Sequence, residues 1–322
     1  MTRPDARRAA LATAAALSMA AVATAAHADF PTRPVTMIVP FAAGGGTDIT
    51  ARVLAGPMAE ALGGEVVVRN VAGAGGTIGA AETAAARADG HTVGLLPVGP
   101  MTTQPHLRAL PYGPDSFDYV CLAYSAPSAI VVRQDSPFQN LNDMIDYARA
   151  NPGELNFAVQ AIGSIPHVAG LGLAEEAGID FTFIPYAGDG PSFTAMLDGS
   201  VHMFISHVSF LRTNADQVRS IALLSDQRMD SAPDLLTAGE QGVEMNYPIW
   251  GGLVVPRGTP AAARDALEAA CEAGVNSPAF TERMEALDTP IVYMGGAEFE
   301  AFVRAEFERN GGLLSAAGLM AD

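Results

Sequence analysis

The sequence predicts an α/β protein of two lobes that are joined by two extended hinge segments. Short β-type runs alternate with helical patterns in both halves of the chain, and a glycine-bearing turn follows several of these runs. Such alternation is typical of a largely parallel sheet that is covered by helices. The 322 residues are enough for two domains, each with a substantial core of its own.

The first 28 residues differ from the rest of the chain and predict a cleaved export signal. Three arginines precede an alanine-rich apolar stretch at 9–26, and Ala26-His27-Ala28 fits a small-x-small cleavage site. A retained anchor is the alternative, which the alanine-rich rather than leucine-rich composition disfavours. Arg7-Arg8 also raises a twin-arginine route, but no clear Phe-Leu follows, so ordinary secretion is favoured. We therefore expect residues 1–28 to be a signal peptide and the mature protein to be periplasmic.

The charge of the mature chain excludes several classes of partner and cofactor. Removing the signal takes away three arginines and one aspartate, which leaves 15 basic and 34 acidic residues and a formal charge of −19. This balance argues against nucleic acid or an anionic membrane as a partner. Every basic residue is arginine, so a lysine-dependent phosphate loop and a Schiff-base cofactor are excluded. We expect no cofactor.

The chain contains two cysteines, Cys121 and Cys271, 150 positions apart. In an oxidising compartment they could form one disulfide, and two buried free thiols are an equal alternative. A lone pair at this separation matches no metal motif, and the five histidines of the mature chain form no zinc-binding pattern. We therefore expect no metal site.

The first unit runs from about residue 30 to residue 125 and reads as strand, glycine loop and helix, repeated. A region rich in proline, glycine and threonine, Pro97–Pro114, is expected to be a loop. The expected strands are Val35–Val39, Val66–Arg69, Thr92–Leu96 and Phe117–Tyr124, and the expected helices are Ile49–Leu62 and Ile78–Ala88.

The second unit repeats this logic, and the chain then returns to the first. Extended segments near Tyr124–Val131 and Met245–Val254 would cross between the units, and Gly251-Gly252 suits a hinge. We expect lobe one at 29–127 and 251–322 and lobe two at 128–250. Further strands are expected at Ala129–Arg133, Asn156–Val159, Phe181–Ile184, Val201–Ile205, Ser220–Leu224 and Tyr247–Val255. Further helices are expected at Leu141–Asn151, Pro191–Asp198, Ala261–Asn276, Pro278–Leu287 and Ala297–Ala317, and another helix is expected to follow His167 and to end at Ala177.

The stretch Val39–Arg52 joins a strand to a helix through three consecutive glycines. Glycine lets the backbone turn its N–H groups toward one point, and the first-turn amides of a helix carry partial positive charge. This stretch is therefore either a seat for an anion or a tight turn that is capped by Thr47 or Asp48.

Ligands of open α/β sheets bind outside the carboxyl ends of the strands. The residues expected there are small, hydroxyl-bearing or glycine, and they offer amides and hydroxyls to a small oxyanion. The predicted binding residues are Phe41, Ala42, Gly45, Gly46, Thr47, Asp48, Ala74, Gly75, Gly76, Thr77, Met101, Thr102, Ile162, Gly163, Ser164, His167, Tyr186, Ala187, Gly188, Ser206 and His207.

Several motifs together resemble the receptors of tripartite tricarboxylate transporters, the Bug-type periplasmic solute-binding proteins. They are PTRPVTMIVPFAAGGGTDITAR, VRNVAGAGGTIGA, ADGHTVGLL, GSIPHVAG, PYAGDGPSFTAMLDGSVHMF, APDLLTAGEQG and GLVVPRGTP, and together they cover nearly all of the mature chain. The resemblance implies a two-lobed "Venus flytrap" of the type II periplasmic-binding-protein kind. It also implies a small carboxylate as ligand, membrane permease subunits as partners and a monomer.

The resemblance implies that the two glycine loops of lobe one seat a carboxylate, and that the segments around Ser164 and Tyr186 complete the site. Two positions depart from the family pattern. Ala187 stands where the family usually has lysine or arginine, and Ser206-His207 stands where it usually has aspartate. The far half of the ligand is therefore expected to be unusual.

Two alternatives to a transport receptor remain open. A secreted α/β enzyme could use Asp48 as a base or Ser164 with His167, although the chain lacks a G-x-S-x-G elbow and a helix cap is the simpler role for Ser164. The other alternative is a sensor that reports ligand occupancy to a membrane signalling protein.

Overall fold

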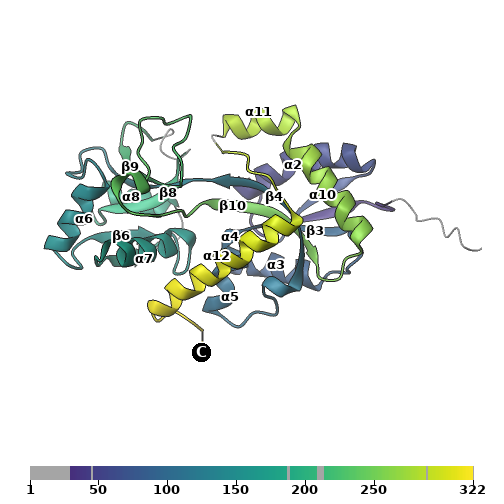
Figure 1. Cartoon of the computed structure of the whole chain (residues 1–322), viewed down its shortest axis with the longest axis horizontal. Helices are drawn as coiled ribbons and strands as arrows, with labels where there is room; N and C mark the ends of the chain where they lie inside the picture. The colour runs from purple at the N-terminus through teal and green to yellow at the C-terminus, as the bar shows by residue number, and fades with distance from the viewer. Residues whose placement is uncertain (1–29, 45, 187–188, 209–213, 288, 322) are drawn as a thin grey trace, which may run out of the picture.

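The computed structural model describes residues 30–44, 46–186, 189–208, 214–287 and 289–321. The predicted signal peptide, residues 1–28, lies outside them. Two mixed sheets form two lobes side by side (Figure 1), which confirms the predicted two-lobed α/β fold. No helix among the described residues is both long enough and apolar enough to span a membrane.

Lobe one is built on a sheet with the order β11-β4-β10-β3-β1-β2. Its strands β1 and β2 pair in parallel, as do β1 and β3, whereas β10 runs antiparallel to both β3 and β4. The strands are β1 (Val35–Val39), β2 (Val66–Asn70), β3 (Thr92–Pro97), β4 (Phe117–Ala126), β10 (Ile249–Pro256) and β11 (Met294–Gly295).

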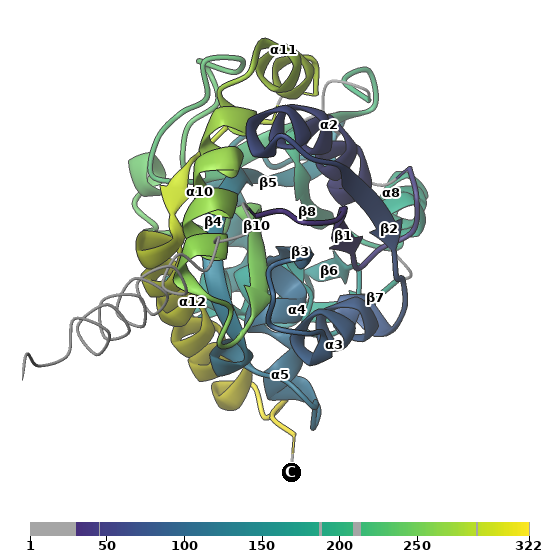
Figure 2. The same cartoon turned by 90° about the vertical axis from the view of Figure 1, so that its right-hand side faces the viewer.

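Helices cover both faces of this sheet (Figure 2). Apolar side chains of α2 (Gly46–Leu62) and α10 (Ala261–Val275), such as Leu54 and Leu267, pack on one face with Val35 and Met37, and all four are fully buried. The helices of lobe one are α2 (Gly46–Leu62), α3 (Thr77–Ala85), α4 (Val98–Thr102), α5 (Gln104–Leu107), α10 (Ala261–Val275), α11 (Pro278–Ala286) and α12 (Gly296–Ala316).

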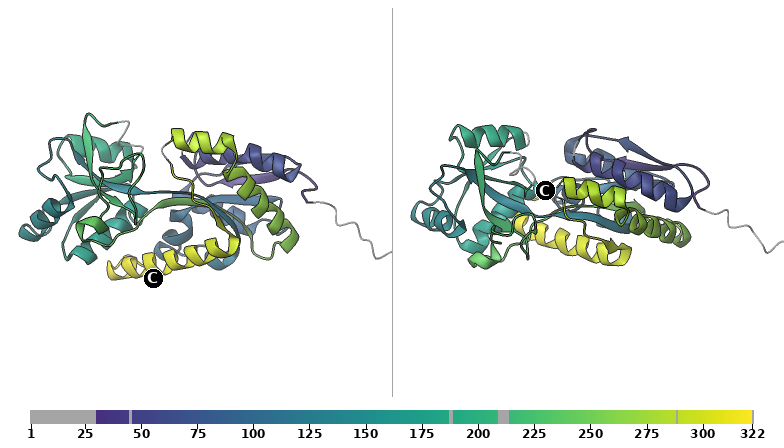
Figure 3. Two further views of the ribbon diagram at one scale, coloured as in Figure 1. Left: turned by 45° about the horizontal axis from the view of Figure 1, so that its top comes forward. Right: turned by 90° about the horizontal axis from the view of Figure 1, so that it is seen from above.

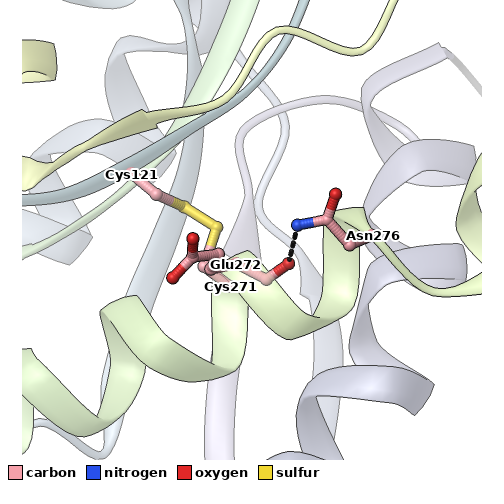
Figure 4. Close-up of a disulfide and its surroundings, with 4 residues drawn as sticks. All are labelled: Cys121, Cys271, Glu272 and Asn276. Carbon is pink, nitrogen blue, oxygen red and sulfur yellow. Dashed lines mark hydrogen bonds between the residues drawn. A yellow bond between two sulfur atoms is a disulfide. The ribbon is translucent and has the colours of Figure 1, made fainter.

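A disulfide joins strand β4 to helix α10 inside lobe one (Figure 4). Cys121 and Cys271 are both fully buried, and their Cα atoms lie 6.6 Å apart. The sequence left a disulfide and two free thiols as alternatives, and the structure shows the disulfide.

Lobe two is built on a sheet with the order β7-β6-β8-β5-β9. Strand β6 runs parallel to β7 and β8, and β5 runs antiparallel to β8 and β9. The elements are β5 (Ser128–Arg133), α6 (Leu141–Ala150), β6 (Asn156–Val159), α7 (Ile165–Ala177), β7 (Thr182–Pro185), α8 (Asp189–Leu197), β8 (Met203–His207) and β9 (Val218–Leu224).

The chain crosses between the lobes at the end of β4 and returns along β10. These two crossing strands pair with each other, with Ile249 opposite Ala126 and Trp250 opposite Ser125. Helix α12 runs beside them (Figure 3) and touches both β4 and α7. Its Arg309 donates to the Asn246 carbonyl at 2.9 Å and lies 4.4 Å from the ring centre of Tyr247. The C-terminal helix is therefore a third connection between the lobes, which the sequence did not predict.

The prediction of a loop at Pro97–Pro114 was wrong, because this region contains the short helices α4 and α5. Its proline, glycine and threonine content is typical of loops. However, Val98 and Met101 are buried in the core, and Asn310 of α12 donates to the Thr102 hydroxyl at 3.0 Å. Contacts with a helix that lies about two hundred positions further along the chain thus stabilise a local structure that composition disfavours.

Candidate ligand-binding site

A cavity of about 890 Å³ lies between the two lobes. Lobe one contributes the first turn of α2 and the start of α4, and lobe two contributes the loop before α7 and its first turn. The described lining residues are Phe41, Gly46, Thr47, Thr50, Gly75, Pro97, Val98, Gly99, Pro100, Gln104, Tyr124, Ala126, Ala161, Gly163, Ser164, Ile165, Pro166, Ile249, Ala286, Leu287 and Thr289.

Asp48 holds the first glycine loop in place from inside α2. Its carboxylate accepts the Gly44 N–H at 2.8 Å, the Arg52 Nε–H at 3.0 Å and the Asn70 amide at 2.8 Å. The Asn70 amide also donates to the Phe41 carbonyl at 3.0 Å. The hydrogen bond from Arg52, with those from Gly44 and Asn70, lowers the pKa of Asp48 to about 2 although burial opposes this shift. Asp48 is thus a buried, ionised brace for the loop.

We expect Asp48→Asn to lower the free energy of unfolding by about 1–2 kcal/mol at neutral pH. A folded pKa of about 2, below the ordinary 3.8, stabilises the protein above about pH 4. This contribution is lost as the pH falls through about 2. Urea unfolding of both proteins should therefore show a deficit that shrinks between about pH 5 and pH 3. A deficit that stays constant over this range would contradict the role of the charge.

The second glycine loop is a tight turn with left-handed backbone. Ala74, Gly75 and Gly76 have φ values of 48°, 69° and 90°, and the Thr77 hydroxyl donates to the Ala74 carbonyl at 3.0 Å. A positive φ at alanine costs free energy, and such strain tends to gather where a ligand is held. Gly75 lines the cavity, whereas Thr77 lies buried behind it.

In lobe two, Ser164 caps α7, as predicted. Its hydroxyl accepts the His167 backbone N–H at 3.4 Å. The His167 ring is buried, and its Nδ1 accepts the Gly163 N–H at 2.9 Å. Burial lowers the pKa of His167 to about 4, so the ring is neutral near pH 7. The imidazole therefore supports the Gly163 loop and makes no hydrogen bond with the Ser164 hydroxyl.

Tyr124 is a lining residue that the sequence analysis missed. It ends the predicted strand Phe117–Tyr124, and its hydroxyl is hydrogen-bonded to Thr47 of the first glycine loop. Burial raises the pKa of Tyr124 to about 12, so the phenol stays protonated. Its place at the carboxyl end of a strand was the signal that could have identified it.

The structure brings together only part of the predicted set around the cavity. Met101 and Thr102 are buried in α4, Ser206 is buried in β8, and Ile162 is exposed. Gly45, Ala187, Gly188 and the side chain of His207 lie outside what the structure describes. Phe41, Gly46, Thr47, Gly75, Gly163 and Ser164 line the cavity, whereas Ala42, Asp48, Ala74, Gly76, Thr77, Met101, Thr102, Ile162, His167, Tyr186 and Ser206 do not.

Most of the other lining residues that the sequence analysis missed come from three places, and Thr50, Gln104 and Ala161 complete the set. Residues 97–100 and 165–166 follow predicted strands or lie in the loops after them, so their position near strand ends was a signal that they could line a site. Ala126 and Ile249 belong to the hinge strands. Ala286 ends α11, and Leu287 and Thr289 follow it; these residues carried no signal of a site, because the tertiary fold alone brings them to the cavity.

Helix ends, not charged side chains, set the electrostatics of this cavity. None of its described lining residues is charged. The first turns of α2 and α7 reach it from opposite lobes, and the amides of a helix N-terminus carry about half a positive charge. Such an arrangement attracts a small anion while hydroxyls and apolar walls shape the rest of the space.

A two-lobed α/β fold with this cavity between its lobes is that of a solute-binding protein. Residues 50–319 match the tripartite tricarboxylate transporter family receptor, and the chain belongs to this family. The family resemblance that the sequence motifs indicated is therefore confirmed.

Solved structures of similar proteins agree with this assignment. The periplasmic binding protein BugD is 34% identical, with a TM-score of 0.75 over 91% of this chain and 100% of BugD. MatC from Rhodopseudomonas palustris with bound malate is 29% identical, with a TM-score of 0.74 over 88% of this chain and 100% of MatC. An R. palustris protein with adipate is 30% identical, with a TM-score of 0.77 over 90% of this chain and 99% of that protein.

Proposed function

We propose that this protein captures a small carboxylate between its lobes and delivers it to the membrane permease subunits of a tripartite tricarboxylate-type transporter. The observation that carries the proposal is the pair of helix N-termini, from α2 and α7, that meet at a cavity whose described lining is uncharged. The similar proteins solved with malate and adipate support a carboxylate as the ligand.

The physical basis is hydrogen bonding to backbone and hydroxyl groups. A hydrogen bond to an ionised group contributes roughly 1.5–3 kcal/mol, and several that converge on one carboxylate offset the cost of removing it from water. Repulsion from the acidic surface is screened beyond about 8 Å at physiological ionic strength. An anion can therefore bind to this acidic protein without a cationic side chain.

We further propose that the receptor works as a monomer in the periplasm after cleavage of residues 1–28. Its lobes would comprise 29–127 with 251–322, and 128–250, and they would close on the ligand about β4 and β10. Binding favours the closed state because the ligand then contacts both lobes.

We also propose that the protein does not turn its ligand over. An enzyme would need a base, and the two candidates have other partners. The Asp48 carboxylate is bound by three donors and has a pKa of about 2, far from the range that suits a base near neutrality. The His167 Nδ1 is engaged by the Gly163 N–H.

A thermal-shift screen of mono-, di- and tricarboxylates tests the proposal, with Thr47→Ala as the matched variant. The right ligand at a hundred times its Kd should stabilise the protein by about 2.7 kcal/mol. Thr47→Ala removes a hydroxyl from the cavity and should weaken binding by roughly tenfold. The unfolding temperature of this variant without ligand should stay close to that of the wild-type protein.

Thr281→Ala serves as the control, because its hydroxyl is exposed on α11 and donates to the Pro278 carbonyl. This variant should bind as tightly as the wild-type protein. Formation of product from any carboxylate, with loss of turnover in Ser164→Ala, would instead show an enzyme. Capture by a membrane signalling protein rather than by permease subunits would show a sensor.

A further inference from the structure

Gln104 begins α5 on the lobe-one wall of the cavity. The residue is only 7% exposed, and its Oε1 is buried. No described residue forms a hydrogen bond with its carboxamide. A buried amide oxygen without a partner is unfavourable, so its presence at a binding cavity indicates a partner outside the protein.

Gln104 is distinctive among the polar side chains that line the described cavity, because each of the others has a partner within the protein. These hydrogen bonds engage the other polar side chains with the protein itself. The Gln104 carboxamide is the polar group of the described lining that lacks such a hydrogen bond. The engaged groups are Thr47 with Tyr124, Thr50 with the Gly46 carbonyl, Ser164 with the His167 amide and Thr289 with the Leu287 carbonyl.

The carboxamide lies beside the backbone of Gly75, within van der Waals reach of a side chain at that position. A Cβ on Gly75 would lie 3.5 Å from both Cδ and Oε1 of Gln104. At the other end of the same short helix, Leu107 packs against Gly163 of lobe two. Gln104 therefore stands beside the second glycine loop, close to where the two lobes meet.

We propose that Gln104 determines the specificity of the site by binding the hydroxyl group of a hydroxycarboxylate. This inference rests on the proposed carboxylate receptor and names the class of its ligand. A carboxamide is uncharged and both donates and accepts, as does a hydroxyl, so each can satisfy the other. A second carboxylate could use only the N–H groups and would meet no cation on the described lining.

Matched pairs of acids that differ in one hydroxyl test this role. Isothermal titration should compare malate with succinate and lactate with propionate, on wild-type protein and on Gln104→Leu. The wild-type protein should bind the hydroxy acid of at least one pair about tenfold more tightly or better. In Gln104→Leu the ratio within that pair should fall to about one, while the acid without the hydroxyl still binds.

The ratio of affinities is the decisive readout, because a merely structural role would weaken both members of a pair alike. Gln104→Asn, which keeps the amide on a shorter side chain, should retain part of the preference. Gln139→Leu is the control, since Gln139 is exposed in lobe two, and its ratio should match wild type. Thermal unfolding without ligand checks that each variant is folded.

The outcomes separate this inference from the proposed function. Equal affinities within each pair for the wild-type protein, or an unchanged ratio in Gln104→Leu, would overturn the role of Gln104 and leave the carboxylate receptor standing. If the wild-type protein bound none of the four acids and no member of the wider carboxylate panel, both proposals would fall.

Discussion

Replacing Gly163 with alanine should weaken carboxylate binding by about 5- to 150-fold. Gly163 has a φ of 73°, and a Cβ there would overlap Leu107 Cδ1 across the gap between the lobes. Rotation of Leu107 about χ2 would move Cδ1 away but would leave its Cγ 3.1 Å from the added Cβ. Overpacking typically costs about 1–3 kcal/mol, and separating the lobes relieves it. The cost therefore falls on the closed, ligand-bound state.

Gly153→Ala is the matched control for this prediction. Gly153 lies in the same lobe with a φ of 75°, but a Cβ there would meet nothing within 4 Å. Both variants should lose about 1–2 kcal/mol of unfolding free energy from the left-handed backbone. Only Gly163→Ala should also lose affinity, and adding Leu107→Ala should restore much of it. Equal affinities of Gly163→Ala and Gly153→Ala would contradict a contact that matters for closure.

Removing the disulfide should lower the free energy of unfolding by about 2–5 kcal/mol. The link between Cys121 and Cys271 spans 150 positions and joins the central part of the lobe-one sheet to α10 (Figure 4). In the chain-entropy account, a long loop restricts the unfolded chain strongly. The double variant Cys121→Ala/Cys271→Ala should therefore unfold at markedly lower urea concentration.

Carboxylate affinity provides the control for the disulfide prediction. Neither cysteine lines the cavity, so affinity at a temperature where both proteins are folded should change by less than about twofold. Wild-type protein that is unfolded and refolded with reductant should match the stability of the variant, apart from the small cavity that alanine leaves. If the oxidised protein and the variant unfolded at the same urea concentration, the disulfide would contribute nothing to stability.

Local pattern was sufficient for most elements of the fold, but not for α4 and α5. The strand Val35–Val39 was predicted with the bounds of β1, and the helices near 49–62 and 141–151 lie within a few residues of α2 and α6. These segments can be recognised from the sequence because apolar periodicity and glycine or proline boundaries are local features. The helix start near Gly46-Thr47 and the cap at Ser164 were predictable for the same reason, since each depends on local sequence.

The tertiary structure decided which of those residues meet. Met101 and Thr102 belong to a predicted strand-end region, yet the packing of α12 turns that region into a buried helix and leaves Gln104 at the cavity. The cavity wall at 286–289 and the Arg309 contact with Tyr247 join segments that are far apart in the chain. Contacts between such distant segments depend on side chains from both of them, so they cannot be predicted from either segment alone.

By itself, the sequence determined a lysine-free α/β protein of two lobes, and it predicted export and glycine loops that offer backbone amides to an anion. Only the tertiary structure decided that two helix starts face each other across one cavity, that Cys121 reaches Cys271, and that the carboxamide of Gln104 has no hydrogen-bond partner among the described residues. The physical reason is that helix and strand formation depends mainly on neighbouring residues. A cavity, a disulfide and the hydrogen bonds of a buried side chain depend instead on which distant segments pack together.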